Sequence, residues 1–306
     1  MSKVVAPAPS RSRLYGAATD TGFLREQNED RYWVDEKLGA YLVVDGMGGR
    51  AAGERAAELA VEAIRETIGS PGGAPGTAEE RIRAAIAAAN HRIYEEARLH
   101  PEFHGMACVL TLALVEDEHI TIGHVGDSRL YLISGGMIRK ITRDHSPVGE
   151  DEEAGEFTEQ EAMRHPRRNE VFRDVGSRPR SADAEDFIDI RKCRFPAAGA
   201  ILLCSDGLSD HLTSSRIREI VEGYSGDPVQ VAHNLVDAAN QAGGKDNITA
   251  LFVAGPDFPG RSGITRPRLS VTRPRTPAHL LTGRLAFMAY GLLLGMLLWA
   301  AFHIRG

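Results

Sequence analysis

Four short acidic motifs hold the side chains of this sequence that are best placed to do chemistry. Three of them occur where a strand pattern ends against glycine or a turn, a geometry that presents carboxylates at the edge of a sheet. The glycines after Asp45 would let the carbonyl of Gly46 turn toward the same point. Such groups could bind cations. The motifs are Val43-Val44-Asp45-Gly46-Met47-Gly48-Gly49, Gly126-Asp127-Ser128-Arg129, Leu203-Cys204-Ser205-Asp206-Gly207-Leu208 and Lys245-Asp246-Asn247.

Each motif taken alone also fits an ordinary structural role. An Asp-Gly pair after a strand is usually just a turn, and Asp246-Asn247 could be an Asx-type turn that opens a strand. Gly126-Asp127 could be a hairpin turn. The segment Arg25-Glu26-Gln27-Asn28-Glu29-Asp30, which lies ahead of the first strands, could be a solvated charge run. Single motifs therefore do not decide the function.

The order of the motifs along the chain is more specific. The series RxxNED, VDGMGG, GDSR, SDG and KDN resembles that of the PP2C (PPM) metal-dependent serine/threonine phosphatases of the bacterial type, from about residue 14 to 254. Thr142-Arg143-Asp144-His145-Ser146 is similar to the family's T-x-DHS stretch. His165-Pro166-Arg167-Arg168-Asn169 with Arg173 resembles the flap segment of bacterial members. The resemblance implies the family's α-β-β-α sandwich.

The resemblance also implies a set of metal ligands. Asp45 would bridge two divalent ions, and the carbonyl of Gly46 would bind one of them. Asp206 and Asp246 would complete the protein ligands, while Asp127 would help to hold a weaker third ion. Ligation by oxygen atoms alone, with several waters left in place, suits Mn²⁺ or Mg²⁺ better than zinc.

The same resemblance implies a mechanism for hydrolysis of phosphoserine and phosphothreonine. Two ions about 3.5–4 Å apart share a water, and the resulting bridging hydroxide attacks phosphorus. Arg25 would bind the phosphoryl oxygens in a bidentate manner. The catalytic residues would then be Asp45, Arg25 and Asp206. Glu29 and Asp30 would orient metal-bound waters from behind the metal ligands, and Asn247 is expected to belong to the same surrounding layer of the site.

Two positions depart from the family pattern. Met47 stands where eukaryotic relatives place a histidine that is proposed as general acid, and bacterial members often have Met there. The residue that protonates the leaving group is therefore left unassigned. The stretch Gly105-Met106-Ala107-Cys108-Val109 lacks two hydroxyls of the family's usual GxGTT/S, which we interpret as a packing variation.

Composition limits the class of protein. The chain has 306 residues, of which 42% are hydrophobic and 25% charged, enough for a sizeable core. Its net charge is −6, yet residues 1–257 carry about −13 because seven arginines and no acid follow Asp257. An acidic body argues against nucleic-acid binding. The three cysteines show no disulfide or zinc spacing, which favours a reducing compartment.

The pattern of apolar residues predicts an α+β fold that matches the implied sandwich. Runs at 40–44, 109–115, 119–125, 129–133, 200–204 and 247–253 indicate strands, and helical spacing indicates helices at 54–68, 79–99, 214–223 and 228–242. Short polar links predict antiparallel hairpins for 109–115/119–125 and for 119–125/129–133. We therefore expect a four-layer α-β-β-α sandwich of two mainly antiparallel sheets covered by helices.

The two ends of the chain differ from this domain. Residues 1–13 are expected to be a flexible leader, 14–254 the phosphatase domain and 255–284 an Arg/Pro-rich linker. Residues 285–302 carry no charge, so we expect a transmembrane helix at 285–304. Six arginines precede this run and one follows it, which places the catalytic domain of a single-pass membrane protein in the cytoplasm.

These observations lead to one expected function and two alternatives. The leading hypothesis is hydrolysis of phosphoserine and phosphothreonine on cytoplasmic proteins, in opposition to a serine/threonine kinase. One alternative is a catalytically weak PP2C-like module that senses or scaffolds a phosphoprotein. The other is a phosphatase for tyrosine or for a small metabolite. Substrate choice is expected to lie in the charged 144–190 insertion.

Overall fold

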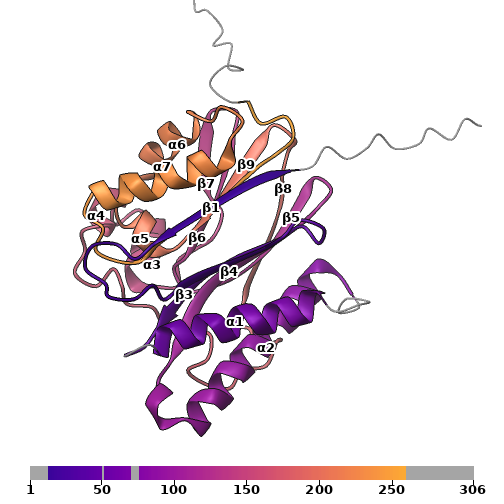
Figure 1. Cartoon of the computed structure of the whole chain (residues 1–306), viewed down its shortest axis with the longest axis vertical. Coiled ribbons are helices and arrows are strands. Elements are labelled where there is room, and N and C mark those ends of the chain that lie inside the picture. Colours follow the sequence, from indigo (N-terminus) through magenta and orange to yellow (C-terminus); the bar gives the residue numbers. More distant parts are fainter. Residues whose placement is uncertain (1–12, 50–51, 70–75, 260–306) are drawn as a thin grey trace, which may run out of the picture. The chain divides into compact units, whose positions relative to one another are not determined.

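Two five-stranded antiparallel sheets form the centre of the protein in the computed structural model, which describes residues 13–49, 52–69 and 76–259 (Figure 1). One sheet has the order β1-β10-β9-β6-β7 and the other the order β2-β3-β4-β5-β8. The strands are β1 (Leu14–Asp20), β2 (Asp30–Asp35), β3 (Ala40–Met47), β4 (Ala107–Glu116), β5 (His119–Val125), β6 (Arg129–Ser134), β7 (Met137–Lys140), β8 (Asp189–Arg194), β9 (Gly199–Cys204) and β10 (Ile248–Ala254).

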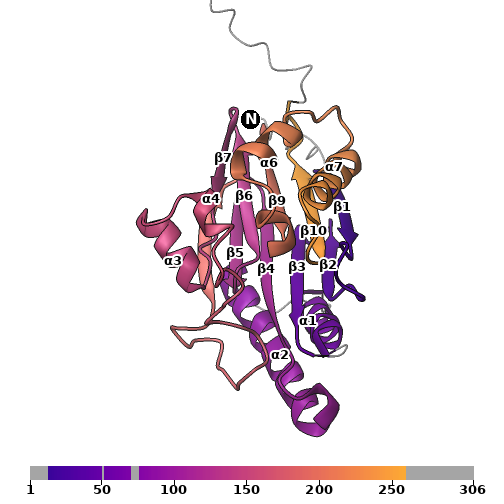
Figure 2. The same cartoon turned by 90° about the vertical axis from the view of Figure 1, so that its left-hand side faces the viewer.

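Helices cover the outer face of each sheet (Figures 1 and 2). The helices α1 (Ala52–Gly69) and α2 (Ala78–Leu99) pack on one sheet, and α6 (Ser214–Val221) and α7 (Pro228–Gln241) pack on the other. A third apolar cluster, which includes Tyr41 and Val43, lies between the sheets. The predicted four-layer α-β-β-α sandwich is therefore confirmed. Short helical segments lie at η1 (Pro101–Phe103), α3 (Pro147–Ala154), α4 (Glu159–Ala162) and α5 (Asp206–Ser209).

The strands that the sequence failed to reveal are those at the four sheet edges. All six predicted strands and four predicted helices are present within three residues of their expected bounds. The strands β1, β2, β7 and β8 were not predicted, and each of them ends a sheet. An edge strand is covered on fewer sides and carries charged side chains, so it lacks the continuous apolar run of a central strand. In β8, for example, the sequence is Asp-Ile-Arg-Lys-Cys-Arg.

One predicted hairpin is wrong. β4 and β5 do form a hairpin, but β5 and β6 belong to different sheets, so residues 126–128 carry the chain from one sheet to the other. Gly126 has a φ of 105°, and a Cβ there would lie 2.1 Å from Cγ1 of Val109. Glycine is therefore required at this crossing. Arg129 then aligns with Cys204 of β9 instead of returning along β5.

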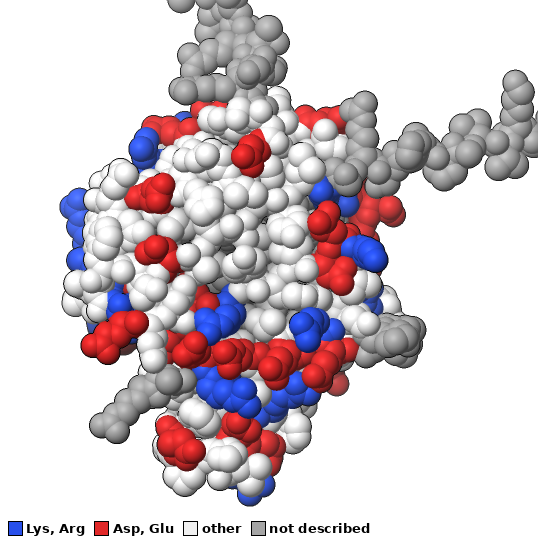
Figure 3. Space-filling model, in the orientation of Figure 1, with Lys and Arg blue, Asp and Glu red and all other residues white. Residues whose placement is uncertain are grey.

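Ion pairs join the two helices that cover the second sheet. Arg55 of α1 contacts Glu96 of α2 at 2.9 Å, and Arg92 of α2 contacts Glu66 of α1 at 2.5 Å. In Figure 3, acidic and basic side chains gather over these two helices, whereas the face above them carries few charges.

The predicted ends of the chain fall largely outside this description. The leader up to residue 12, the linker beyond residue 259 and the whole 285–304 segment lie outside the described residues. Within residues 13–49, 52–69 and 76–259, no helix is long and apolar enough to cross a membrane.

Candidate active site

All the acidic motifs meet at one cavity of about 210 Å³, at the ends of strands from both sheets. Of the predicted site residues, only Asp30 is absent from the cavity lining. Segments more than 200 residues apart in the chain, such as 25–29 and 246–247, lie side by side there. The lining residues are Arg25, Glu29, Asp45, Gly46, Met47, Gly48, Val109, Asp127, Asn169, Val171, Asp206, Asp246 and Asn247.

Asp45 lies inside a strand. The sequence predicted that the strand ends at residue 44, but β3 continues to Met47 because β4 pairs with it along its whole length. Asp45 is aligned with Asp30 of β2 on one side. The next residue, Gly46, packs so closely on α1 that a Cβ would lie 2.0 Å from the carbonyl oxygen of Gly53. A glycine is therefore needed to bring the start of α1 against the carboxylate.

Asp30 is buried directly behind the cavity. Its side chain is 1% exposed, and its Oδ2 accepts a hydrogen bond from Oγ of Ser205 at 2.7 Å. The same Oγ accepts a hydrogen bond from the backbone N–H of Thr249 at 2.9 Å. Oδ1 of Asp30 has no partner among the described residues. Burial raises the pKa of Asp30 to about 6.

The carboxylates around the cavity disfavour one another's charge. Burial, followed by repulsion from neighbouring carboxylates, raises the pKa of Asp45 and of Asp206 well above the ordinary range. Burial, together with Asp144 and Asp210, raises the pKa of Asp127 to about 7. A partly buried cluster of acids with so little compensating charge fits divalent cations, which would stabilise the ionised form of its members.

The geometry suits ions that keep part of their water shell. No group of three or more His, Cys, Asp or Glu side chains in the described part of the chain forms a ready-made ligand set for one ion. The carboxylates instead surround a cavity that can also hold water. A few protein oxygens with several waters is the usual environment of Mg²⁺. The residues present therefore fit hydrated Mg²⁺ or Mn²⁺.

Arg25 and Asn247 join the first loop of the chain to the end of β10. Nη2 of Arg25 contacts Oδ2 of Asp246 at 2.7 Å, while 47% of the Arg25 side chain stays exposed. Asn247 is buried, and its Oδ1 accepts a hydrogen bond from the N–H of Glu29 at 2.8 Å. Its Nδ2 donates to the carbonyls of Thr21 and Gln27. Asn247 thus fixes the loop that carries Arg25 and Glu29.

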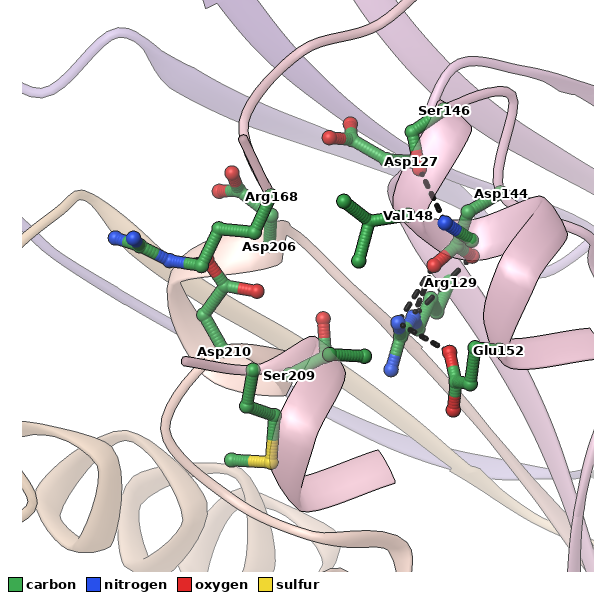
Figure 4. A pocket seen from close by; sticks show the side chains of 13 residues that line it. Asp127, Arg129, Asp144, Ser146, Val148, Glu152, Arg168, Asp206, Ser209 and Asp210 are labelled. Carbon is green, nitrogen blue, oxygen red and sulfur yellow. Dashed lines mark hydrogen bonds and ion pairs between the residues drawn. The ribbon is translucent and has the colours of Figure 1, made fainter. Parts of the chain in front are cut away.

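A buried ion-pair network lies beside Asp127, around a second cavity of about 20 Å³ (Figure 4). Nε of Arg129 donates to Oδ2 of Asp144 at 2.9 Å, and its Nη2 lies 3.3 Å from Glu152 of α3. Figure 4 shows these groups on one side of the small cavity and Asp206, Asp210 and Arg168 on the other. The 144–152 segment is thereby attached to the strand that follows Asp127.

The sequence of this chain matches that of a known protein family. Residues 25–237 match the sequence model of protein phosphatase 2C. The chain belongs to the protein phosphatase 2C family.

Curated relatives in the protein phosphatase 2C family come from several bacteria. The chain is 33% identical over 256 residues to the serine/threonine protein phosphatase PstP of Mycobacterium tuberculosis, a match that covers 84% of this chain and 47% of the relative. This chain thus spans about half the length of that relative. It is 35% identical over 240 residues to the serine/threonine phosphatase stp of Listeria monocytogenes, covering 77% of this chain and 93% of the relative.

Solved protein phosphatase 2C structures share the fold. The crystal structure of PstP from Mycobacterium tuberculosis matches with a TM-score of 0.70 and 30% identity, over 79% of this chain and 98% of that one. The catalytic domain of PstP in complex with two manganese ions matches with a TM-score of 0.69 and 29% identity, over 79% of this chain and 98% of that chain.

Several residues of this protein phosphatase 2C site were not assigned from sequence. Asn169 and Val171 line the cavity, Ser205 holds Asp30, and Asp210 borders the smaller cavity. Asn169 and Ser205 lie inside motifs that the sequence analysis identified, so their place in these motifs could have indicated that they belong to the site. Nothing in the sequence indicated a role for Val171, because its apolar side chain can neither bind a metal ion nor transfer a proton.

Packing explains why residues 105–109 differ from the GxGTT/S pattern of the family. Cys108 is fully buried in the cluster between α1, α2 and their sheet, and its backbone pairs with Val175 through bonds of 2.9 and 2.8 Å. Burial raises the pKa of its thiol well above the usual range. Cys108 therefore acts as a small apolar residue of the core.

Proposed function

We propose that this chain hydrolyses phosphoserine and phosphothreonine in proteins with the help of two Mn²⁺ or Mg²⁺ ions. The observation that carries the proposal is the convergence of Asp45, Asp127, Asp206, Asp246 and Arg25 on one cavity. Membership of the protein phosphatase 2C family and the manganese-bound PstP catalytic domain support it.

In this proposal the cavity carboxylates hold the ions. Asp45 would contact both ions, the carbonyl of Gly46 one of them, and Asp206 and Asp246 would complete the set. Asp127, on the crossing between the sheets, would help to hold a weaker third ion. When bound, two such ions activate a water for attack on phosphorus and offset the charge of the phosphoryl oxygens.

The other residues of the cavity would bind the phosphoryl group of the substrate and the water molecules around the ions. The half-exposed guanidinium of Arg25 would bind two phosphoryl oxygens while Asp246 limits its movement. Asp30 would hold water at the cavity from behind Asp45, since its Oδ1 has no partner among the described residues. Glu29 would do the same from the cavity wall. Met47 lines the cavity but has no proton to donate, so the leaving-group proton comes from elsewhere.

Phosphate release from a phosphothreonine peptide tests this function. We expect turnover with Mn²⁺ or Mg²⁺, none with EDTA, and a loss of about a hundredfold or more in Asp45→Asn and Asp206→Asn. Asp237→Asn, on the exposed side of α7, is the matched control and should keep full activity. Folded, Mn²⁺-treated protein that releases no phosphate from any peptide of a phosphoserine and phosphothreonine panel would contradict the proposal. Faster turnover of phosphotyrosine or small phosphoesters would favour the alternative substrates.

We also propose, from sequence alone, that residues 285–304 anchor the enzyme to the cytoplasmic side of a membrane, where it opposes a serine/threonine kinase. Support comes from the uncharged run at 285–302 and from the six arginines before it. The full chain should sediment with membranes after carbonate washing, whereas a chain ending at residue 259 should stay in the supernatant. Equal distribution of the two chains would contradict the anchor.

A further inference from the structure

A groove larger than the active-site cavity is lined by residues next in the chain to those of that cavity. It has a volume of about 490 Å³, and its polar lining includes Gln160, Arg164, Arg168, Asp210, His211 and Lys245. We refer to it as the basic groove. Two of its residues are chain neighbours of active-site residues, because Arg168 precedes Asn169 and Lys245 precedes Asp246.

These shared segments place the groove within reach of a substrate bound in the cavity. Consecutive Cα atoms are about 3.8 Å apart, so the two linings approach each other closely at both pairs of neighbours. Arg168 and Asp210 also line the small cavity that contains Asp206. An extended peptide advances about 3.3 Å per residue. A phosphorylated residue in the active site would therefore put a side chain only a few positions away into the basic groove.

The charge of the basic groove is opposite to that of the active site. Nε of Arg168 is paired with Oδ2 of Asp210 at 2.7 Å, which neutralises that pair. Arg164 and Lys245 are exposed, and no ion pair of either appears among the described residues. Two positive charges thus stand uncompensated in the groove, next to a cavity that bears five carboxylates. A ligand with anionic oxygens complements this arrangement.

We infer that the basic groove is a specificity subsite for an anionic side chain near the phosphorylated residue of the substrate. Arg164 presents a planar guanidinium that can hold two oxygens, and Lys245 contributes a point charge. A glutamate, an aspartate or a second phosphorylated residue would supply the same kind of oxygen. This inference rests on the proposed phosphatase function.

The test compares kcat/KM for phosphothreonine peptides that differ only in the flanking residues. Starting from a neutral peptide, glutamate is placed at each flanking position in turn. A second phosphothreonine is then placed at the preferred position. We expect one position to raise kcat/KM about three- to tenfold, and the gain to shrink as NaCl is raised from about 0.05 M to about 0.5 M. A larger gain from phosphate than from glutamate would identify a phosphorylated neighbour as the ligand. Equal gains would identify any anionic side chain.

Variants of the full chain then test whether the preference for an anionic residue depends on the basic groove. Arg164→Gln/Lys245→Gln should reduce the gain to less than about twofold, while Arg164→Lys/Lys245→Arg should retain it. Lys37→Gln/Arg139→Gln removes two exposed charges that line neither cavity and should leave the gain intact. All variants should hydrolyse para-nitrophenyl phosphate, which is too small to reach the groove, at the wild-type rate.

Two results would overturn the inference. One is wild-type enzyme with no preferred position for an anionic residue, and the other is a preference that survives in Arg164→Gln/Lys245→Gln. A failure of the proposed function is distinguishable from both, because it would abolish Mn²⁺-dependent hydrolysis of para-nitrophenyl phosphate as well.

Discussion

Asn247 shows how one buried amide can fix a catalytic loop. Both ends of its side chain are used, with one hydrogen bond from the N–H of Glu29 and two to the carbonyls of Thr21 and Gln27. The loop is also attached through the Arg25–Asp246 ion pair and through Nδ2 of Asn28, which donates to Oγ1 of Thr19, while its Phe23 and Leu24 are exposed. The position of Arg25 therefore depends on a residue more than 200 positions away.

Replacing Asn247 with alanine should damage both stability and catalysis. Three backbone groups would lose their buried partner, so we expect the free energy of unfolding to fall by about 1–3 kcal/mol and kcat/KM to fall about tenfold or more. Urea denaturation in EDTA and a phosphothreonine peptide assay measure the two effects. Asn234→Ala, at an exposed position of α7, is the control and should change stability by less than about 0.5 kcal/mol. Equal behaviour of the two variants would refute this role.

Metal ions should stabilise the folded chain through the same carboxylates that raise one another's pKa. Binding adds about 2.7 kcal/mol when the free ion is at about 100 times Kd, so Mn²⁺ should raise Tm relative to EDTA. Asp45→Asn should lose most of this increase. In EDTA the variant should be at least as stable as wild type, because the surroundings of Asp45 disfavour its charged form and asparagine carries no charge. A full Mn²⁺-induced increase in Tm in the variant would place the ions elsewhere.

At the scale of elements, the β5–β6 crossing is held by a buried ion pair and a buried histidine. The Arg129 and Asp144 side chains are 9% and 5% exposed, and the guanidinium lowers the pKa of Asp144 even though burial opposes this. His145, next in the chain, accepts a hydrogen bond from the N–H of Gly126 through Nδ1 at 3.0 Å. These contacts attach the 144–152 segment to the turn that carries Asp127.

Removing one partner of the buried pair should be costly. Arg129→Met leaves the Asp144 carboxylate buried without its partner, so we expect a loss of about 3–5 kcal/mol in the free energy of unfolding. Arg129→Met/Asp144→Leu should recover part of that loss. The exposed pair Arg98–Glu95 provides the control, since Arg98→Met should cost less than about 1 kcal/mol. Denaturation by urea measures all three, and a cost for Arg129→Met as small as that for Arg98→Met would contradict the account.

The histidines of this element predict a loss of stability in mild acid. Burial lowers the pKa of His145 from its ordinary value of 6.5 to about 2, and it also lowers that of His124, whose ring is 4.9 Å away. Below about pH 6.5 the unfolded chain gains protons that the folded chain does not, so the free energy of unfolding decreases by up to about 1.4 kcal/mol per pH unit for each histidine. His145→Gln should reduce the slope measured by urea denaturation between about pH 7 and pH 5. An unchanged slope would contradict this. The other charged groups that act on His145 are Arg173, Arg180 and Arg191.

At the scale of the whole molecule, the predictions from sequence agree with the structure for those elements whose formation depends on the pattern of nearby residues. The buried strands and long helices were predictable because both faces of each central strand are covered and each helix has one apolar face. The motif series also predicted eight of the thirteen residues that line the cavity. The pairing of Arg25 with Asp246 and the crossing at Gly126 were not predictable, because both depend on contacts between distant segments. The edge strands were missed because exposure removes the apolar signal.

The most direct test of the central claim is the anomalous difference map of a crystal of this protein soaked in MnCl₂. Two peaks about 3.5–4 Å apart are expected in the cavity between the sheets, both next to the carboxylate of Asp45, with Asp206 and Asp246 as further ligands. A crystal of Asp45→Asn treated in the same way should lose at least one peak. Manganese bound only outside this cavity, or not bound at all by well-ordered protein, would contradict the assignment of these carboxylates as the metal site of a phosphatase.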